Sequence, residues 1–131
     1  MQLIPAAIDE LPRVDGPLVA NTRTTTREAT INGRTISEGE RISLMWIAAN
    51  RDPRTFDTPN EIRLDRDQRA NLLYGAGIHY CLGAPLARLE LCVTIETLLA
   101  HTAEISLASH EPLERETYPG NGFVSVPVRI C

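Results

Sequence analysis

The clearest hydrophobic pattern in the chain covers residues 84–101. Two rows of apolar side chains follow helical spacing there on different faces: Leu82, Leu86, Leu89 and Val93 on one, and Ala84, Leu91, Ile95 and Leu98 on the other. Apolar residues on two faces are typical of a helix that is covered on most sides. We therefore predict a buried helix over residues 84–101.

The first fifty residues predict a short helix followed by extended segments. Pro5 is a favourable first helical residue, and Pro12 should disrupt or end the helix because it lacks an N–H. Residues 22–31 and 34–37 form the two strands of a predicted hairpin around Asn32-Gly33, a strong two-residue turn. A second turn at 38–40, a short strand at 42–45 and a helical turn at 46–50 complete this part.

The remaining segments are less regular. Residues 51–70 carry Asp-Pro, Thr-Pro and many charges without periodicity, which predicts a long irregular segment on a surface. Residues 103–108 and 123–130 alternate loosely and predict two strands joined through a turn-rich connection. The fold class is therefore mixed α/β (α+β), with small antiparallel sheets.

Composition and charge narrow the class of protein. Hydrophobic residues make up 43% and charged residues 23% of 131 residues, which is typical of one soluble globular domain. The net charge of −4 argues against a nucleic-acid or anionic-membrane surface, because both need basic patches. Three cysteines form no disulfide framework, and residues 1–7 show no signal-peptide pattern. We expect a cytoplasmic protein without a membrane span.

The candidate chemistry lies in a glycine-rich loop around Cys81, with glycines at 75, 77 and 83. Glycines allow sharp turns and the close approach of a flat ligand. Cys81 also precedes the predicted helix, whose N-terminal partial charge favours a thiolate. The site suits a nucleophile, a redox thiol or a metal ligand, whereas a lone cysteine is more often a small buried hydrophobic residue.

Three other classes of site fit this loop poorly. A phosphate loop would need Gly-Lys-Ser/Thr, and a dinucleotide site would need a third glycine at a different spacing. A structural zinc site would need a Cys-x-x-Cys pair, which the chain lacks. Nothing in the sequence specifies the histidine base of a cysteine protease.

The run from Tyr74 to Arg88 resembles the heme-binding signature of the cytochrome P-450 family, Phe-Gly-x-Gly-x-His/Arg-x-Cys-x-Gly-x-x-Leu-Ala-Arg. Every fixed position agrees except the first, where Tyr74 replaces phenylalanine. The resemblance implies heme as the cofactor and Cys81 as the metal ligand, through its thiolate. The implied cofactor-binding residues are Arg23, Tyr74, Gly75, Gly77, His79, Cys81, Gly83 and Ala87.

Within this set, Arg23 and His79 are the implied partners of the heme propionates, with Arg27 as the alternative to Arg23. The chain itself supplies no implied catalytic residue. Glu10 and Arg13 match the family's Glu-x-x-Arg pair, which is a buried network closed by a second arginine.

Arg66 is the best match for that second arginine, and Arg63 is the alternative. Residues 49–53 resemble the loop that enters the family's irregular segment. Residues 121–128 resemble its closing hairpin, in which Phe123 would face the substrate side.

The resemblance runs from about Leu3 to the C-terminus and implies a single partial domain, 1–131, from the C-terminal heme-binding portion of the fold. The family's central oxygen-handling helix has no counterpart here. The implied function is a heme-thiolate monooxygenase that inserts one oxygen atom from O2 into a small organic substrate. Its electrons would come from a redox partner of the ferredoxin or flavoprotein type.

Two alternatives to this function remain open. The chain could be a truncated, catalytically silent remnant that binds heme weakly or not at all. It could also be a metal or redox-thiol protein that uses Cys81, His79 and Cys92.

Overall fold

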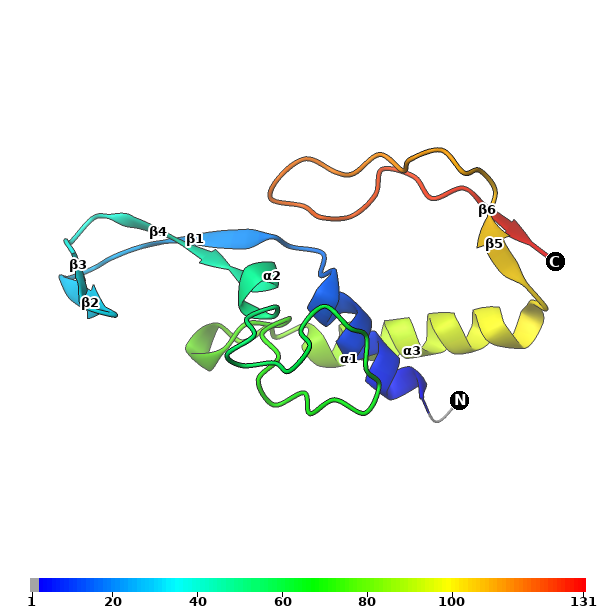
Figure 1. Cartoon of the computed structure of the whole chain (residues 1–131), viewed down its shortest axis with the longest axis horizontal. Coiled ribbons are helices and arrows are strands. Elements are labelled where there is room, and N and C mark those ends of the chain that lie inside the picture. The colour runs from blue at the N-terminus through cyan, green and yellow to red at the C-terminus, as the bar shows by residue number, and fades with distance from the viewer. Residues whose placement is uncertain (1–2) are drawn as a thin grey trace.

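The computed structural model describes residues 3–131 as helices and short hairpins joined by long irregular segments (Figure 1). The elements in order are α1 (Ile4–Val14), β1 (Ala20–Thr24), β2 (Ala29–Ile31), β3 (Arg34–Ile36), β4 (Arg41–Met45), α2 (Trp46–Ala49), the 3-10 helix η1 (Gly77–His79), α3 (Ala84–His101), β5 (Ile105–Leu107) and β6 (Val128–Ile130). Helices α1 and α3 pack against each other, and two extended arms leave this centre. The mixed α/β class with small antiparallel sheets is confirmed.

Helix α1 continues through Pro12, so the expectation that this proline ends the helix is wrong. Proline at position 12 forfeits only the hydrogen bond to the carbonyl of residue 8. The next turn still closes, because the N–H of Asp15 donates to the carbonyl of Leu11 at 3.0 Å. The side chain of Arg13 is also fixed to Glu10 from the same helix, which holds the last turn in place.

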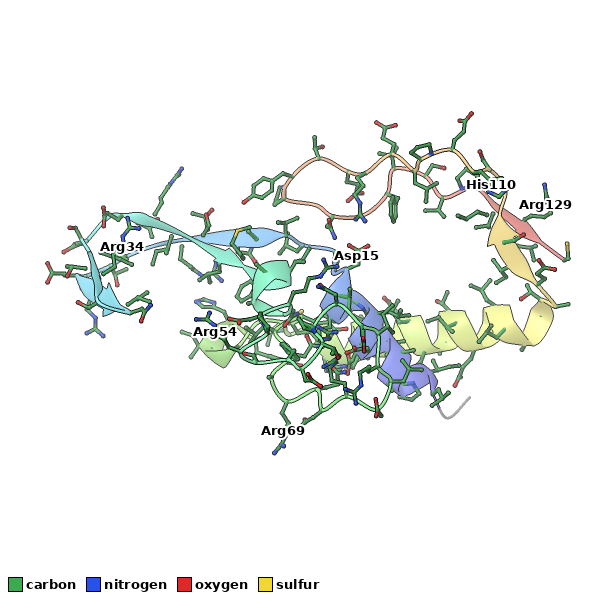
Figure 2. All side chains as sticks on the ribbon, in the orientation of Figure 1. Asp15, Arg34, Arg54, Arg69, His110 and Arg129 are labelled. Carbon is green, nitrogen blue, oxygen red and sulfur yellow. The ribbon has the colours of Figure 1, made fainter. Side chains whose placement is uncertain are left out.

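The predicted hairpin around Asn32-Gly33 is confirmed. Strands β2 and β3 pair antiparallel, and the turn residues Asn32 and Gly33 have φ of 48° and 79°. Positive φ at both central positions gives a hairpin turn whose twist matches that of the strands. In Figure 2, Arg34 marks the far tip of this arm.

Strands β1 and β4 form a second antiparallel pair and connect the arm to the centre. The register pairs Asn21 with Leu44 and Arg23 with Ile42. Because side chains alternate along a strand, Asn21 and Arg23 lie on one face of this ribbon. That face borders the pocket described below.

Helix α3 occupies the predicted range, but the expectation that it is buried does not hold within this chain. Only Ala84 is fully buried, whereas Leu86, Leu89 and Val93 are 59%, 60% and 52% exposed. The physical reason is a lack of partners: among the helices and strands of residues 3–131, α1 is the main one packed against α3. The row that contains Leu86, Leu89 and Val93 is left facing outward.

The irregular segment predicted at 51–70 is confirmed as a chain of turns that folds back toward α1. Arg54 and Arg69 project from it into solvent (Figure 2). At the C-terminal end, β5 and β6 pair antiparallel but span only three residues each, so the predicted strands are shorter than expected. No helix of the described residues, 3–131, is long and apolar enough to cross a membrane.

Candidate functional site

A pocket of about 720 Å³ lies where five parts of the chain meet: α1, the β1–β4 ribbon, the cysteine loop (residues 74–83), α3 and the C-terminal loop (residues 108–127). This volume falls within the usual range for sites that bind small molecules and cofactors. Its walls are formed by Pro12, Asp15, Pro17, Leu18, Asn21, Arg23, Leu44, Trp46, Leu73, Tyr74, Gly75, Ala76, His79, Cys81, Ala87, Leu91, Asn121, Gly122 and Phe123. The lining is mainly apolar, with a thiol and a few polar groups.

The cysteine loop brings Cys81 to the wall of this pocket. The N–H of Cys81 donates to the carbonyl of Tyr74 at 2.9 Å, which closes the loop on itself. Gly75 and Gly77 have φ of 74° and 66°, a region that other L-residues rarely adopt. The Cys81 side chain stays exposed, and Cys81 lies three residues before the first residue of α3.

Six of the eight residues expected to bind the cofactor line the pocket: Arg23, Tyr74, Gly75, His79, Cys81 and Ala87. Gly77 and Gly83 do not. Gly77 serves the turn through its positive φ, and a Cβ added at Gly83 would meet the Cys81 sulfur at an ordinary 3.8 Å. Arg27, the alternative to Arg23, is exposed on the arm and does not line the pocket.

A cluster of aromatic and ionic contacts fixes the cysteine loop to α1. The Arg88 guanidinium lies 4.5 Å from the centre of the Tyr74 ring, and it donates to Asp9 on α1 at 2.9 Å. It also donates to the Tyr80 hydroxyl at 3.2 Å. Burial raises the pKa of the Tyr74 hydroxyl, although the positive charge of Arg88 opposes this. The cluster joins both ends of the loop to α1 and α3.

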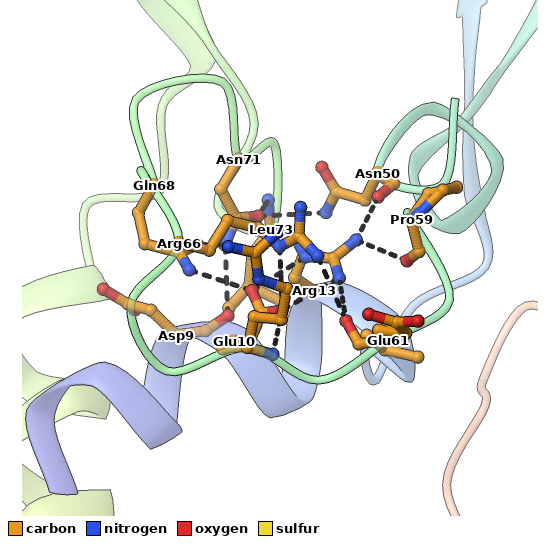
Figure 3. Close-up of polar contacts among 12 residues, drawn as sticks. Asp9, Glu10, Arg13, Asn50, Pro59, Glu61, Arg66, Gln68, Asn71 and Leu73 are labelled. Atoms are coloured by element: carbon orange, nitrogen blue, oxygen red, sulfur yellow. Dashed lines mark hydrogen bonds and ion pairs between the residues drawn. The ribbon is translucent and has the colours of Figure 1, made fainter. Parts of the chain in front are cut away.

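The Glu10–Arg13 pair is fully buried, as the resemblance implied (Figure 3). Arg13 donates to both carboxylate oxygens of Glu10, at 2.8 and 2.9 Å. Its remaining donors go to the carbonyls of Asn50, Pro59 and Glu61 at 2.6, 2.9 and 3.1 Å. The pair therefore ties α1 to the irregular segment at several points.

Arg66 closes this network, as expected, through its Nε at 3.0 Å from Glu10. Arg63, the alternative, donates to Glu10 only through its backbone N–H, at 3.0 Å. The Gln68 side-chain amide also donates to Glu10, at 2.9 Å. Burial raises the pKa of Glu10, but the hydrogen bonds from Arg13, Gln68, Arg63 and Arg66 outweigh it and lower the pKa to about 2. The carboxylate is therefore held ionised in a fully buried position.

Two asparagines that the sequence did not single out connect the network to the cysteine loop. The buried Asn50 accepts the N–H of Leu72 at 2.7 Å and donates to Asn71 at 3.0 Å. Asn71 in turn accepts the N–H of Leu73 at 2.9 Å and donates to the carbonyl of Asp9 at 3.1 Å. Only the position of Asn50 in residues 49–53 offered a signal for this link, because neither residue belongs to a periodic pattern.

The chemistry of the pocket fits a heme with a thiolate ligand. One thiol, Cys81, borders a mainly apolar cavity, and Arg23 and His79, which line the same cavity, can donate hydrogen bonds to carboxylates. Within residues 3–131, no three or more His, Cys, Asp and Glu side chains gather as metal-ligand sets do. The alternative of a metal site built from Cys81, His79 and Cys92 therefore finds no ligand cluster in the described part.

Comparison with known proteins places the chain in a family. The family model described as Cytochrome P-450 matches residues 1–129. The chain is 39% identical over 118 residues to the cyclomarin C epoxidase CymV of Salinispora arenicola, covering 90% of this chain and 30% of that protein. It is 37% identical over 127 residues to the steroid C26-monooxygenase of Mycolicibacterium smegmatis, covering 97% and 31%. The chain belongs to the cytochrome P-450 family.

Solved structures agree at the level of the fold. The ligand-free cytochrome P-450 TbtJ1 superposes with a TM-score of 0.93 at 35% identity, covering 99% of this chain and 35% of that one. The substrate-free CYP150A6 of Mycobacterium marinum gives 0.93 at 33% identity, covering 99% and 34%. The chain thus has the family's fold over almost all its length but spans only about a third of these relatives.

Proposed function

We propose that this chain is the heme-binding portion of a heme-thiolate monooxygenase, with the Cys81 thiolate as the iron ligand. The single observation that carries the proposal is the position of Cys81. A glycine loop with two positive φ angles presents its side chain at the wall of an apolar pocket. The sequence around it matches the signature of a family in which heme is the cofactor.

The other site residues receive roles from their places in the pocket. Arg23 on β1 and His79 in the loop are the two groups suited to hold the heme carboxylates. Tyr74 and Ala87 offer apolar surface against the flat ring. Gly75, Gly77 and Gly83 let the backbone turn around the sulfur.

Heme, when bound, supplies the chemistry that inserts one oxygen atom from O2 into an organic molecule. The residues of this chain orient it, neutralise its charge and border the space for a small organic substrate. The relatives include an epoxidase and a steroid monooxygenase, which supports an organic substrate of unspecified class. We assign the electron supply to a ferredoxin or flavoprotein partner, and the three free cysteines support a cytoplasmic location.

The chain forms a single partial domain over residues 1–131 in this proposal, and the rest of the fold must cover it. Its outward α3 row, with Leu86, Leu89 and Val93 more than half exposed, has the composition of an internal surface. This same observation favours the second candidate, a catalytically silent remnant, if nothing covers that row. The two candidates differ in whether heme is bound through Cys81.

The test is reconstitution of the chain with heme, followed by reduction and treatment with carbon monoxide. We expect an absorption maximum typical of thiolate ligation, lost in Cys81→Ser and retained in Cys92→Ser, because Cys92 lies on α3 outside the pocket lining. Equal loss in both variants would contradict the assignment of the ligand. Absence of heme uptake by the unmodified chain would favour the silent remnant.

A further inference from the structure

A polar cluster at the rim of the pocket has no role in the site described above. The Asp15 carboxylate, at the end of α1, accepts hydrogen bonds from the two terminal nitrogens of Arg115, both at 3.2 Å. The Asn121 side chain adds a third donor at 2.7 Å. In Figure 2, Asp15 lies beneath the C-terminal loop that carries the other two residues. The cluster therefore joins segments about a hundred positions apart in sequence.

Backbone hydrogen bonds fix the same loop to the chain that follows α1. The N–H of Asn121 donates to the carbonyl of Pro17 at 3.0 Å, and the N–H of Val19 donates to that of Pro119 at 2.9 Å. The Asn121 side chain also donates to the carbonyl of Gly16 at 2.9 Å. These contacts hold the tip of the loop beside β1, next to the pocket.

Phe123 is the large apolar residue that this loop presents to the pocket. Its backbone forms a bridge with Arg115, and the Arg115 guanidinium lies 4.5 Å from the centre of its ring. A guanidinium above an aromatic face is an attractive arrangement. The Arg115 guanidinium thus binds the Asp15 carboxylate and also lies over the Phe123 ring.

We propose that Asp15, acting through Arg115 and Asn121, is a positioning residue that holds Phe123 at the pocket wall and so limits the shape of ligand that the pocket admits. The part that concerns ligands depends on the proposed function, whereas the part that concerns the position of Phe123 does not. The Asp15 and Arg115 side chains are 45% and 47% exposed, so a simple ion pair there would contribute little. This pair has a defined geometry, because both Asp15 oxygens are engaged by Arg115, Asn121 adds a third donor, and the guanidinium lies over the Phe123 ring.

The position of Phe123 can be measured directly, because the chain contains only two phenylalanines. We would label the full chain with 4-fluorophenylalanine and record its fluorine NMR spectrum. Phe56, which is 3% exposed within the Glu10–Arg13 network, serves as the internal reference. Asp15→Asn and Arg115→Gln should each shift the Phe123 signal and leave the Phe56 signal in place. In the double variant, the Phe123 signal should shift little further than in either single variant.

The matched control is Asp67→Asn, which breaks the exposed ion pair with Arg69 away from this pocket. It should leave both fluorine signals unchanged. An unchanged Phe123 signal in Asp15→Asn and Arg115→Gln would overturn the positioning role. Equal changes at Phe56 and Phe123 would do the same, since they would indicate general unfolding.

The ligand part is tested on the heme-loaded chain by optical titration with imidazole and with the bulkier 4-phenylimidazole. Asp15→Asn should change the affinity for 4-phenylimidazole about fivefold, the size expected for one such polar contact. The affinity for imidazole should change less than about twofold by the same measure. Equal changes in the affinity for both ligands would overturn the proposal that Phe123 limits the shape of the ligand. A chain that takes up no heme would instead contradict the proposed function and leave the fluorine result to decide the position of Phe123.

Discussion

At the scale of single residues, the most constrained position is Glu10. Its carboxylate is fully buried and receives donors from both α1 and the irregular segment. Breaking a buried pair from one side leaves the other charge without a partner, which costs about 3–5 kcal/mol. That is a large share of the stability of an ordinary domain.

We therefore expect Glu10→Ala or Arg13→Ala to reduce the yield of soluble chain strongly. Arg27→Ala is the control, because Arg27 is exposed on the arm and no hydrogen bond or ion pair of its side chain contributes to the network. The measurement is the soluble yield and the thermal unfolding midpoint of all three variants. Similar values for all three variants would mean that the buried network is not what holds the irregular segment.

The same residue predicts an acid dependence of stability. The pKa of Glu10 is about 2 in the folded chain and ordinarily near 4.5. A lowered pKa contributes stability that is complete above the unfolded value and is lost as the pH falls from about 4.5 to about 2. The difference in free energy of unfolding between the unmodified chain and Glu10→Gln should therefore shrink across this range. Glu96→Gln, on the exposed surface of α3, should show no such trend.

The sequence predicted part of this network and not the rest, for a physical reason. Glu10, Arg13 and Arg66 carry charges that recur in a known motif, so their pairing could be expected before the structure. Gln68, Asn50 and Asn71 act through geometry alone: each supplies an amide where a backbone or side-chain partner needs one. Asparagine and glutamine in an irregular segment have many possible partners, and only the folded chain selects among them.

At the scale of elements, local patterns were reliable where the backbone itself decides. The Asn32-Gly33 hairpin and the range of α3 follow from turn chemistry and helical spacing. Pro12 misled the prediction for α1, because the rule against proline inside helices ignores compensating contacts of its neighbours. Arg13 provides such a contact one residue later.

The cysteine loop gives a prediction at this scale. Gly75 has φ of 74°, so an alanine there would be strained by about 1–2 kcal/mol. Gly83→Ala is the matched control: its φ is −82°, and the added Cβ would meet only the Cys81 sulfur at 3.8 Å. Denaturant unfolding should show lower stability for Gly75→Ala and nearly unchanged stability for Gly83→Ala. Equal losses would mean that the positive φ of Gly75 is not what makes a side chain costly there.

At the scale of the whole molecule, the chain is open. It exposes 9746 Å² to solvent. A compact protein of 14.5 kDa would expose about 6,900 Å². Within residues 3–131 the buried apolar residues are few: Ile4, Ile8, Ala20, Phe56 and Ala84. The sequence could not reveal this, because hydrophobic spacing shows which residues favour burial and says nothing of whether the chain contains the surface that buries them.

The outward row of α3 makes this openness testable. Leu86, Leu89 and Val93 form a continuous apolar surface, and surfaces of this kind drive association when nothing covers them. The 131-residue chain alone should therefore self-associate as its concentration rises, and the double substitution Leu89→Glu with Val93→Glu should reduce this. Light scattering over a concentration series gives the measurement.

The control for this experiment adds the same charge elsewhere. Ile31 and Ile62 are 55% and 54% exposed but lie apart, one at the tip of the β2–β3 hairpin and one in the irregular segment. Isolated apolar residues on a surface are ordinary and drive little association. Ile31→Glu with Ile62→Glu should thus leave self-association nearly as it was. If both double variants reduce self-association equally, then net charge and not the α3 row controls self-association. If only the α3 variant does, the apolar row of α3 is the surface that drives self-association.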